Sequence, residues 1–106
     1  MTAPPPDDPV ARAAALLRSD DPGEVAAAEA LLLAAMADDS RARPLAAAAY
    51  DRRRMLGGRP QKFGTQTVER DGRRELWPVD PATTDSERSK WGLPSLAELR
   101  RTADSH

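Results

Sequence analysis

Apolar residues recur at three- and four-residue intervals through the first half of the chain, which is the spacing of an amphipathic helix. A first helix is expected to begin at Asp8-Pro9, because an N-cap carboxylate there precedes a proline at the first helical position. It should end near Ser19. A second helix is expected over residues 22–37, because Asp21-Pro22-Gly23-Glu24 repeats the start signal and adds a capping-box glutamate.

A third helix is expected over residues 42–56, followed by Gly57-Gly58 at the left-handed position where helices commonly end. The pattern then changes. Residues 63–69 and 74–79 are short runs with β-forming side chains, and the Asp71-Gly72 step between them is a strong hairpin signal. An isolated hairpin is marginal in water, so we expect this one to pack across the helices.

Capping-box patterns at Thr84 and Ser95 predict one or two short C-terminal helices. Residues 1–7 include three consecutive prolines and are expected to form a disordered tail, which leaves residues 8–106 as a single small domain. The predicted fold class is therefore mainly α, with three N-terminal helices, a small two-stranded β-hairpin and the short C-terminal helices.

Composition excludes several kinds of chemistry. The chain has no cysteine, and its one histidine is the last residue, His106. Thiolate metal sites, cysteine nucleophiles and a Ser-His-Asp triad within the chain are excluded, and we expect no metal and no cofactor. No run approaches the roughly 20 apolar residues of a membrane-spanning helix, and the first residues do not resemble a signal peptide. We therefore expect a cytoplasmic protein with no membrane partner, and the excess of arginine and alanine is typical of GC-rich bacterial genomes.

Charge is unevenly distributed although the net charge is only −1. Residues 1–50 carry eight acidic and four basic side chains, whereas residues 51–75 carry eight basic and four acidic ones. The basic segment could attract an anionic ligand, although such charge runs are more often solvated faces. Arg52-Arg53-Arg54 is a short run without interleaved aromatic residues, so we do not expect a nucleic-acid partner.

The polar residues best suited to binding or catalysis form three motifs in a fixed order. These motifs are Asp51-Arg52 with Gly58-Arg59-Pro60-Gln61-Lys62-Phe63-Gly64-Thr65-Gln66, then Trp77-Pro78-Val79-Asp80-Pro81, and then Asp85-x-x-Arg88-x-x-x-Gly92-Leu93. Their order and spacing resemble the signature of an uncharacterised bacterial family, a domain of unknown function. The likeness covers residues 50–96.

The resemblance implies that this chain is a short member of the family, without the leading helices of longer members. It also marks one departure, because Leu17-Arg18-Ser19-Asp20 stands in the first helix where the family often has a histidine. The family supplies positions for a site but no activity.

Eight residues of these motifs are expected to converge on one small region. Arginines can hold a carboxylate or phosphate, and amides and hydroxyls can donate or accept hydrogen bonds, which makes ligand-binding candidates of Arg52, Gln61, Thr65, Gln66 and Arg88. An aspartate becomes a general base where burial raises its pKa, so the catalytic candidates are Asp51, Asp80 and Asp85. The same groups could instead be structural, with Asp51 paired to Arg88 or Asp85 paired to Arg52.

The expected function is that of a small binding or accessory protein that holds an anionic group or a protein partner at this polar site. The alternative is a small cofactor-free enzyme, such as an isomerase, cyclase or hydrolase, with an aspartate as general base. The sequence decides neither between these two functions nor on an oligomeric state.

Overall fold

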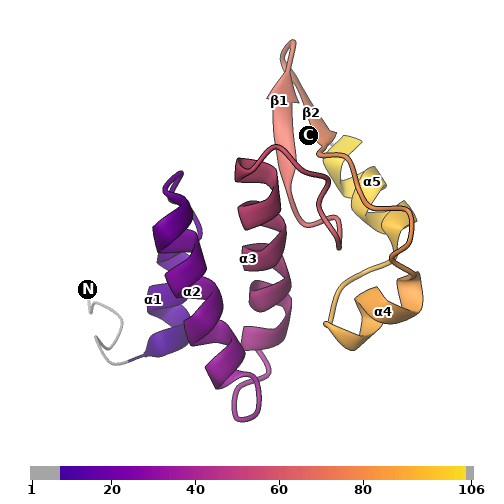
Figure 1. Cartoon of the computed structure of the whole chain (residues 1–106). Helices are drawn as coiled ribbons and strands as arrows, with labels where there is room; N and C mark the ends of the chain where they lie inside the picture. Colours follow the sequence, from indigo (N-terminus) through magenta and orange to yellow (C-terminus); the bar gives the residue numbers. More distant parts are fainter. Residues whose placement is uncertain (1–7, 105–106) are drawn as a thin grey trace, which may run out of the picture.

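Five helices and one β-hairpin form residues 8–104, the part of the chain that the computed structural model describes (Figure 1). The expected tail, residues 1–7, lies outside this range. The elements in chain order are α1 (Pro9–Leu16), α2 (Pro22–Ala35), α3 (Ala42–Leu56), β1 (Thr67–Arg70), β2 (Arg73–Leu76), α4 (Asp85–Lys90) and α5 (Leu96–Asp104). The predicted fold class is confirmed.

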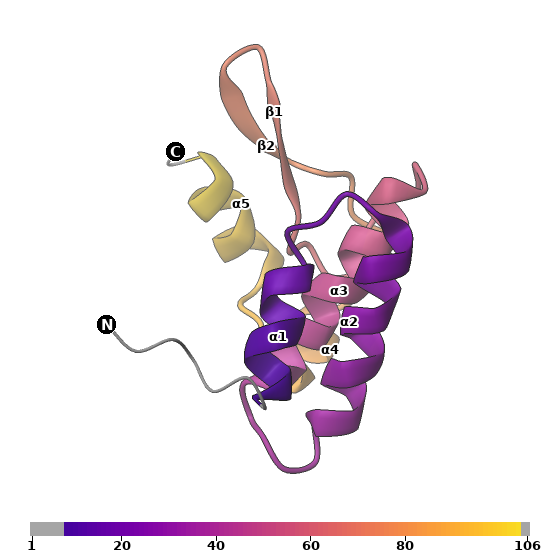
Figure 2. The ribbon, with the colours of Figure 1, turned by 90° about the vertical axis from the view of Figure 1, so that its left-hand side faces the viewer.

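The N-terminal half is a small bundle in which α2 packs against both α1 and α3 (Figures 1 and 2). The Asp8 carboxylate accepts hydrogen bonds from the N–H groups of Val10 and Ala11 in α1, and the Asp21 carboxylate accepts one from the Gly23 N–H in α2, so both helices begin where predicted. Each ends two or three residues before its predicted end. The core between them is built mainly of alanine, which allows close helix approach, and consists of Val10, Ala13, Ala28, Leu32, Ala42, Ala46 and Ala49.

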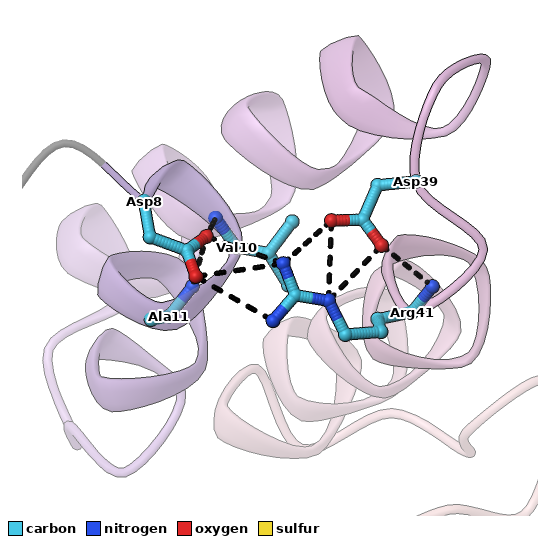
Figure 3. Close-up of polar contacts among 5 residues, drawn as sticks. All are labelled: Asp8, Val10, Ala11, Asp39 and Arg41. Carbon is cyan, nitrogen blue, oxygen red and sulfur yellow. Dashed lines mark hydrogen bonds and ion pairs between the residues drawn. The ribbon is translucent and has the colours of Figure 1, made fainter. Parts of the chain in front are cut away.

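Arg41 links the start of α1 to the loop between α2 and α3 (Figure 3). Its guanidinium lies 2.6 Å from the Asp39 carboxylate and 3.3 Å from that of Asp8. The hydrogen bond from this guanidinium is the main reason that the pKa of Asp39 lies below its usual value. For Asp8 the pKa is lowered first by the backbone N–H of Ala11 and then by Arg41. These contacts hold the N-terminus of α1 close to the loop that follows the C-terminus of α2.

The hairpin turns where predicted but is shorter than predicted. Asp71 and Gly72 have φ angles of 52° and 77°, the left-handed values that a two-residue hairpin turn requires. The strands pair antiparallel from Thr67 opposite Leu76 to Arg70 opposite Arg73. Residues 63–66 are not a strand, which corrects the prediction, because backbone N–H groups there donate to a side chain of α3 instead of to a neighbouring strand.

The hairpin packs on α5 and not across the three N-terminal helices, which also corrects the prediction. In Figure 2 it extends past the ends of α1, α2 and α3, with α5 beside it. The ends of the hairpin segment meet where Gln61 and Val79 form an isolated parallel bridge. There the Gln61 N–H donates to the Pro78 carbonyl and the Asp80 N–H donates to the Gln61 carbonyl, each at 2.8 Å.

Two short C-terminal helices are present, and each begins at its predicted cap. The Thr84 hydroxyl accepts from the Glu87 N–H at 3.1 Å, and the Ser95 hydroxyl accepts from the Glu98 N–H at 3.3 Å. Within residues 8–104, no helix has both the length and the apolar character needed to cross a membrane.

Candidate functional site

Asp51 is a fully buried carboxylate on α3 that organises the polar loop, residues 61–66. Its Oδ1 accepts from the N–H groups of Lys62 at 2.8 Å and Phe63 at 2.9 Å. Its Oδ2 accepts from the N–H groups of Gly64 and Thr65 and from the Thr65 hydroxyl, at 3.1, 3.0 and 2.7 Å. Five donors thus compensate for the removal of this charge from water.

Gln61 is also fully buried, and its amide joins the polar loop to the strand side of the molecule. Its Nε2 donates to the carbonyls of Gln66 at 2.9 Å and Trp77 at 2.7 Å, and its Oε1 accepts from the Gln66 N–H at 2.8 Å. The Gln66 amide makes weaker contacts, donating to the Thr65 hydroxyl at 3.1 Å and the Ala48 carbonyl at 3.4 Å. Both amides are therefore engaged with the protein itself.

Arg88 approaches the polar loop from α4 and is only 2% exposed. Its Nε donates to the Phe63 carbonyl at 2.8 Å, and its Nη1 donates to the Thr83 carbonyl and to Asp85. Asp51 and Arg88 thus bind the N–H and the C=O of the same residue, Phe63, and are not paired with each other. Arg88 Nη2 is buried and has no hydrogen-bond partner within residues 8–104.

Most of the predicted set is joined in one network. Asp51, Gln61, Thr65, Gln66 and Arg88 share the contacts around the polar loop, Asp85 is attached through Arg88, and the backbone of Asp80 binds Gln61. Arg52 points elsewhere, because it donates to the Ser19 carbonyl and to Asp20 at the turn between α1 and α2. The observed ion pairs are therefore Asp85–Arg88 and Asp20–Arg52 in place of the two pairings considered from the sequence.

A groove of about 370 Å³ lies beside this network, between α2, α3, the polar loop and the end of α4. Residues one or two turns apart on one face of each helix line it, together with two consecutive loop residues. The lining residues are Glu29, Leu33, Ala46, Tyr50, Arg53, Lys62, Phe63, Glu87 and Trp91. A volume of this size is within the range of small-molecule sites.

Three aromatic rings line the groove in sequence, with Phe63 in the middle. Its ring centroid lies 6.0 Å from that of Tyr50 and 5.3 Å from that of Trp91. The ring planes are inclined to each other by 72° in the first pair and 52° in the second. Phe63 can hold this position because Asp51 and Arg88 fix its peptide groups on both sides. The buried network therefore determines the shape of the groove.

Two ion pairs accompany the rings. Arg53 donates to Glu29 and lies 5.2 Å above the Tyr50 ring, and Lys62 lies 2.9 Å from Glu87 and 5.6 Å from the Phe63 centroid. The hydrogen bond that Lys62 donates to the Glu87 carboxylate is the main reason that the pKa of Lys62 is raised. The groove thus combines apolar walls with two cations that already lie over aromatic faces.

The groove was not predicted from the sequence. Tyr50, Phe63 and Trp91 lie far apart in the chain, and a lone aromatic residue is more often a core residue than a ligand contact. The available signal was that Lys62 and Phe63 lie inside the polar motif. Among the described residues, no three acidic or histidine side chains gather closely enough to hold a metal ion.

Comparison with known proteins assigns no family, because no family model, no curated protein and no solved structure matches the chain. The likeness to an uncharacterised bacterial family stays a prediction.

Proposed function

We propose that this chain is a non-catalytic binding protein that holds a small apolar anion in the groove beside the polar loop. In this proposal the polar residues that the sequence singles out support the site, and their neighbours Lys62 and Phe63 contact the ligand. The observation that carries the proposal is the row of three aromatic rings with Arg53 and Lys62 over two of them.

The positions of the two cations favour an anionic ligand over a cationic one. A cationic guest would meet Arg53 and Lys62 on the ring faces that would otherwise attract it. Of the eight basic side chains in residues 51–75, Arg53 and Lys62 line the groove, and Arg54 lies 5.5 Å from the centroid of the Tyr50 ring. Rings and aliphatic side chains in the lining suit an apolar ligand body.

Binding without catalysis is favoured by the contacts of the three candidate bases. Asp51 accepts five hydrogen bonds, which exceeds the roughly four lone-pair sites of a carboxylate. Asp80 accepts from the Ala82 N–H, and Asp85 accepts from Arg88 and the Leu96 N–H. Each aspartate thus has a structural partner, and the groove is lined by other residues.

The proposal can be tested with two fluorescent probes of the same shape, 8-anilinonaphthalene-1-sulfonate and its uncharged analogue N-phenyl-1-naphthylamine. In a Trp77→Phe background, Trp91 is the one remaining tryptophan, so energy transfer from it reports probe binding, and substitution of residues that line the groove locates that binding. We expect both probes to bind and the sulfonate to bind more tightly. Circular dichroism during the titration verifies that the protein stays folded.

The two lysines of the chain provide a matched control. Lys62→Gln should reduce the preference for the sulfonate, whereas Lys90→Gln, which removes the same charge outside the groove, should preserve it. Leu33→Gln should weaken both probes, because Leu33 is an exposed residue of the apolar wall. Equal binding of the two probes by the unmodified groove, or no transfer from Trp91, would contradict the proposal.

A further inference from the structure

The two ion pairs beside the groove differ in how easily a ligand could replace one partner. Arg53 makes two hydrogen bonds to Glu29, at 3.0 and 3.4 Å, and the Glu29 side chain is only 15% exposed. Lys62 makes one contact with Glu87, at 2.9 Å, and the two side chains are 33% and 37% exposed. An exposed pair of this kind contributes little net stability, so it can be opened at small cost.

Lys62 and Glu87 also come from different elements that meet at the groove. Lys62 follows Gln61 in the polar loop, whose backbone is fixed by Asp51, whereas Glu87 lies in the first turn of α4. Both side chains line the groove, and the Lys62 ammonium lies against the ring of Phe63. The Glu87 carboxylate thus contacts the Lys62 ammonium at the edge of an apolar groove.

We infer that Glu87 occupies the position of the ligand's own carboxylate, so that the groove selects apolar carboxylates and Glu87 acts as a built-in competitor. This inference rests on the proposed function. In the exchange, Lys62 keeps its charge and passes from the Glu87 carboxylate to that of the ligand, while the freed Glu87 side chain turns to solvent. No covalent bond changes.

The chemistry of lysine suits such an exchange. An ammonium group carries three equivalent N–H donors and acts as a point charge, so it does not require the two-bond geometry that holds Arg53 to Glu29. The hydrogen bond to Glu87 is the main reason that the pKa of Lys62 is raised, so the ammonium already holds one carboxylate of the kind it would hold in the exchange. Glu87 itself is a carboxylate on a short aliphatic stem, which is the same chemistry as the proposed ligand.

The test uses 2-naphthylacetate and the matched alcohol 2-(2-naphthyl)ethanol, titrated into the full chain and followed by the amide signals of Phe63 and the indole signal of Trp91. Glu87→Gln should tighten binding of the carboxylate by about two- to five-fold, the range expected for removing an exposed competing pair. Binding of the alcohol should not change. Glu69→Gln serves as the control because it removes the same charge from an exposed position on β1 outside the groove.

Glu87→Asp covers the case in which the glutamine variant weakens α4. It keeps a negative charge in the first turn of the helix but shortens the stem, so it should tighten carboxylate binding to a smaller extent. If the wild-type groove binds the carboxylate and neither Glu87 variant tightens it, the inference is overturned and the proposed function stands. If neither naphthyl probe shifts the signals of Phe63 and Trp91, the proposed function fails and the inference fails with it.

Discussion

Asp51 Oδ2 accepts two hydrogen bonds from Thr65, one from its backbone N–H at 3.0 Å and one from its hydroxyl at 2.7 Å. With the bonds from Lys62, Phe63 and Gly64, one side chain of α3 thereby fixes four consecutive residues of the polar loop. The loop's conformation is thus specified by a residue 11 to 14 positions earlier in the chain.

Replacing Asp51 by alanine should destabilise the protein by about 3 kcal/mol or more, because it leaves four backbone N–H groups without their acceptor. Asp80→Ala is the matched control. The Asp80 carboxylate accepts one hydrogen bond, from the Ala82 N–H at 2.9 Å, so the loss of this side chain should cost about 1 kcal/mol. Urea unfolding measures the free energy of unfolding of both variants. Equal losses would show that the five Asp51 contacts contribute no more stability than the single hydrogen bond of the Asp80 turn.

The two glutamines of the polar loop should also differ in how much stability their replacement by alanine costs. Gln61→Ala removes three hydrogen bonds from a fully buried side chain and should cost about 2–4 kcal/mol. Gln66→Ala removes two longer contacts from a half-buried side chain and should cost about 1 kcal/mol. Thermal unfolding of the two variants gives the order directly, and the reverse order would contradict the roles assigned to them.

Gly64 is expected to resist substitution for two separate reasons. Its φ of +99° disfavours any side chain, and an added Cβ would lie 3.1 Å from Leu99 Cδ1 of α5. Gly58→Ala is the control, because Gly58 has φ +74° but open space around its Cβ position. Gly64→Ala should therefore be more destabilising than Gly58→Ala by about 1 kcal/mol or more.

Steric contact with Leu99 can be separated from backbone strain by a double-mutant cycle in the equilibrium unfolding of Gly64→Ala and Leu99→Ala. If the contact contributes, the double variant should lose less stability than the sum of the single variants. Strict additivity would assign the whole effect to the backbone.

Local features of the fold could be predicted because the residues that decide them are close in sequence. Asp8, Asp21, Thr84 and Ser95 each accept from an N–H two or three residues ahead, and Asp71-Gly72 adopts its turn within the hairpin. Such contacts leave a recognisable pattern in a short window of sequence.

Features set by distant residues could not be predicted. The first strand is shorter than its sequence suggests because Asp51 takes the backbone donors of residues 62–65. Arg52 bonds to Ser19, 33 positions away, and no local pattern indicates that partner. The groove needs α2, α3, the polar loop and α4 together, so the sequence indicated the neighbourhood of the site but not its walls.

Arg41 should make stability depend on pH through Asp8 and Asp39. Folding lowers the pKa of both carboxyls, so their contribution is present above the usual value of 3.8 and is lost as the pH falls through the lower folded values. Arg41→Gln should reduce this acid dependence, more for Asp39, whose pKa depends mainly on that guanidinium.

Carboxyl NMR titration of wild type and Arg41→Gln measures the two pKa values directly. An upward move of the Asp39 pKa with a smaller move for Asp8 is expected, because the backbone N–H of Ala11 still supports Asp8 in the variant. Unchanged values for both would mean that the contacts in Figure 3 do not persist in solution.

The parallel bridge between Gln61 and Val79 has a consequence for engineering. Because backbone hydrogen bonds join the two ends of the hairpin segment, the segment begins and ends at neighbouring positions on the rest of the domain. The turn at Asp71-Gly72 is exposed at the far tip of the hairpin. A peptide grafted between these two residues would be displayed away from the groove, and the domain could serve as a carrier without change to the residues that line the groove.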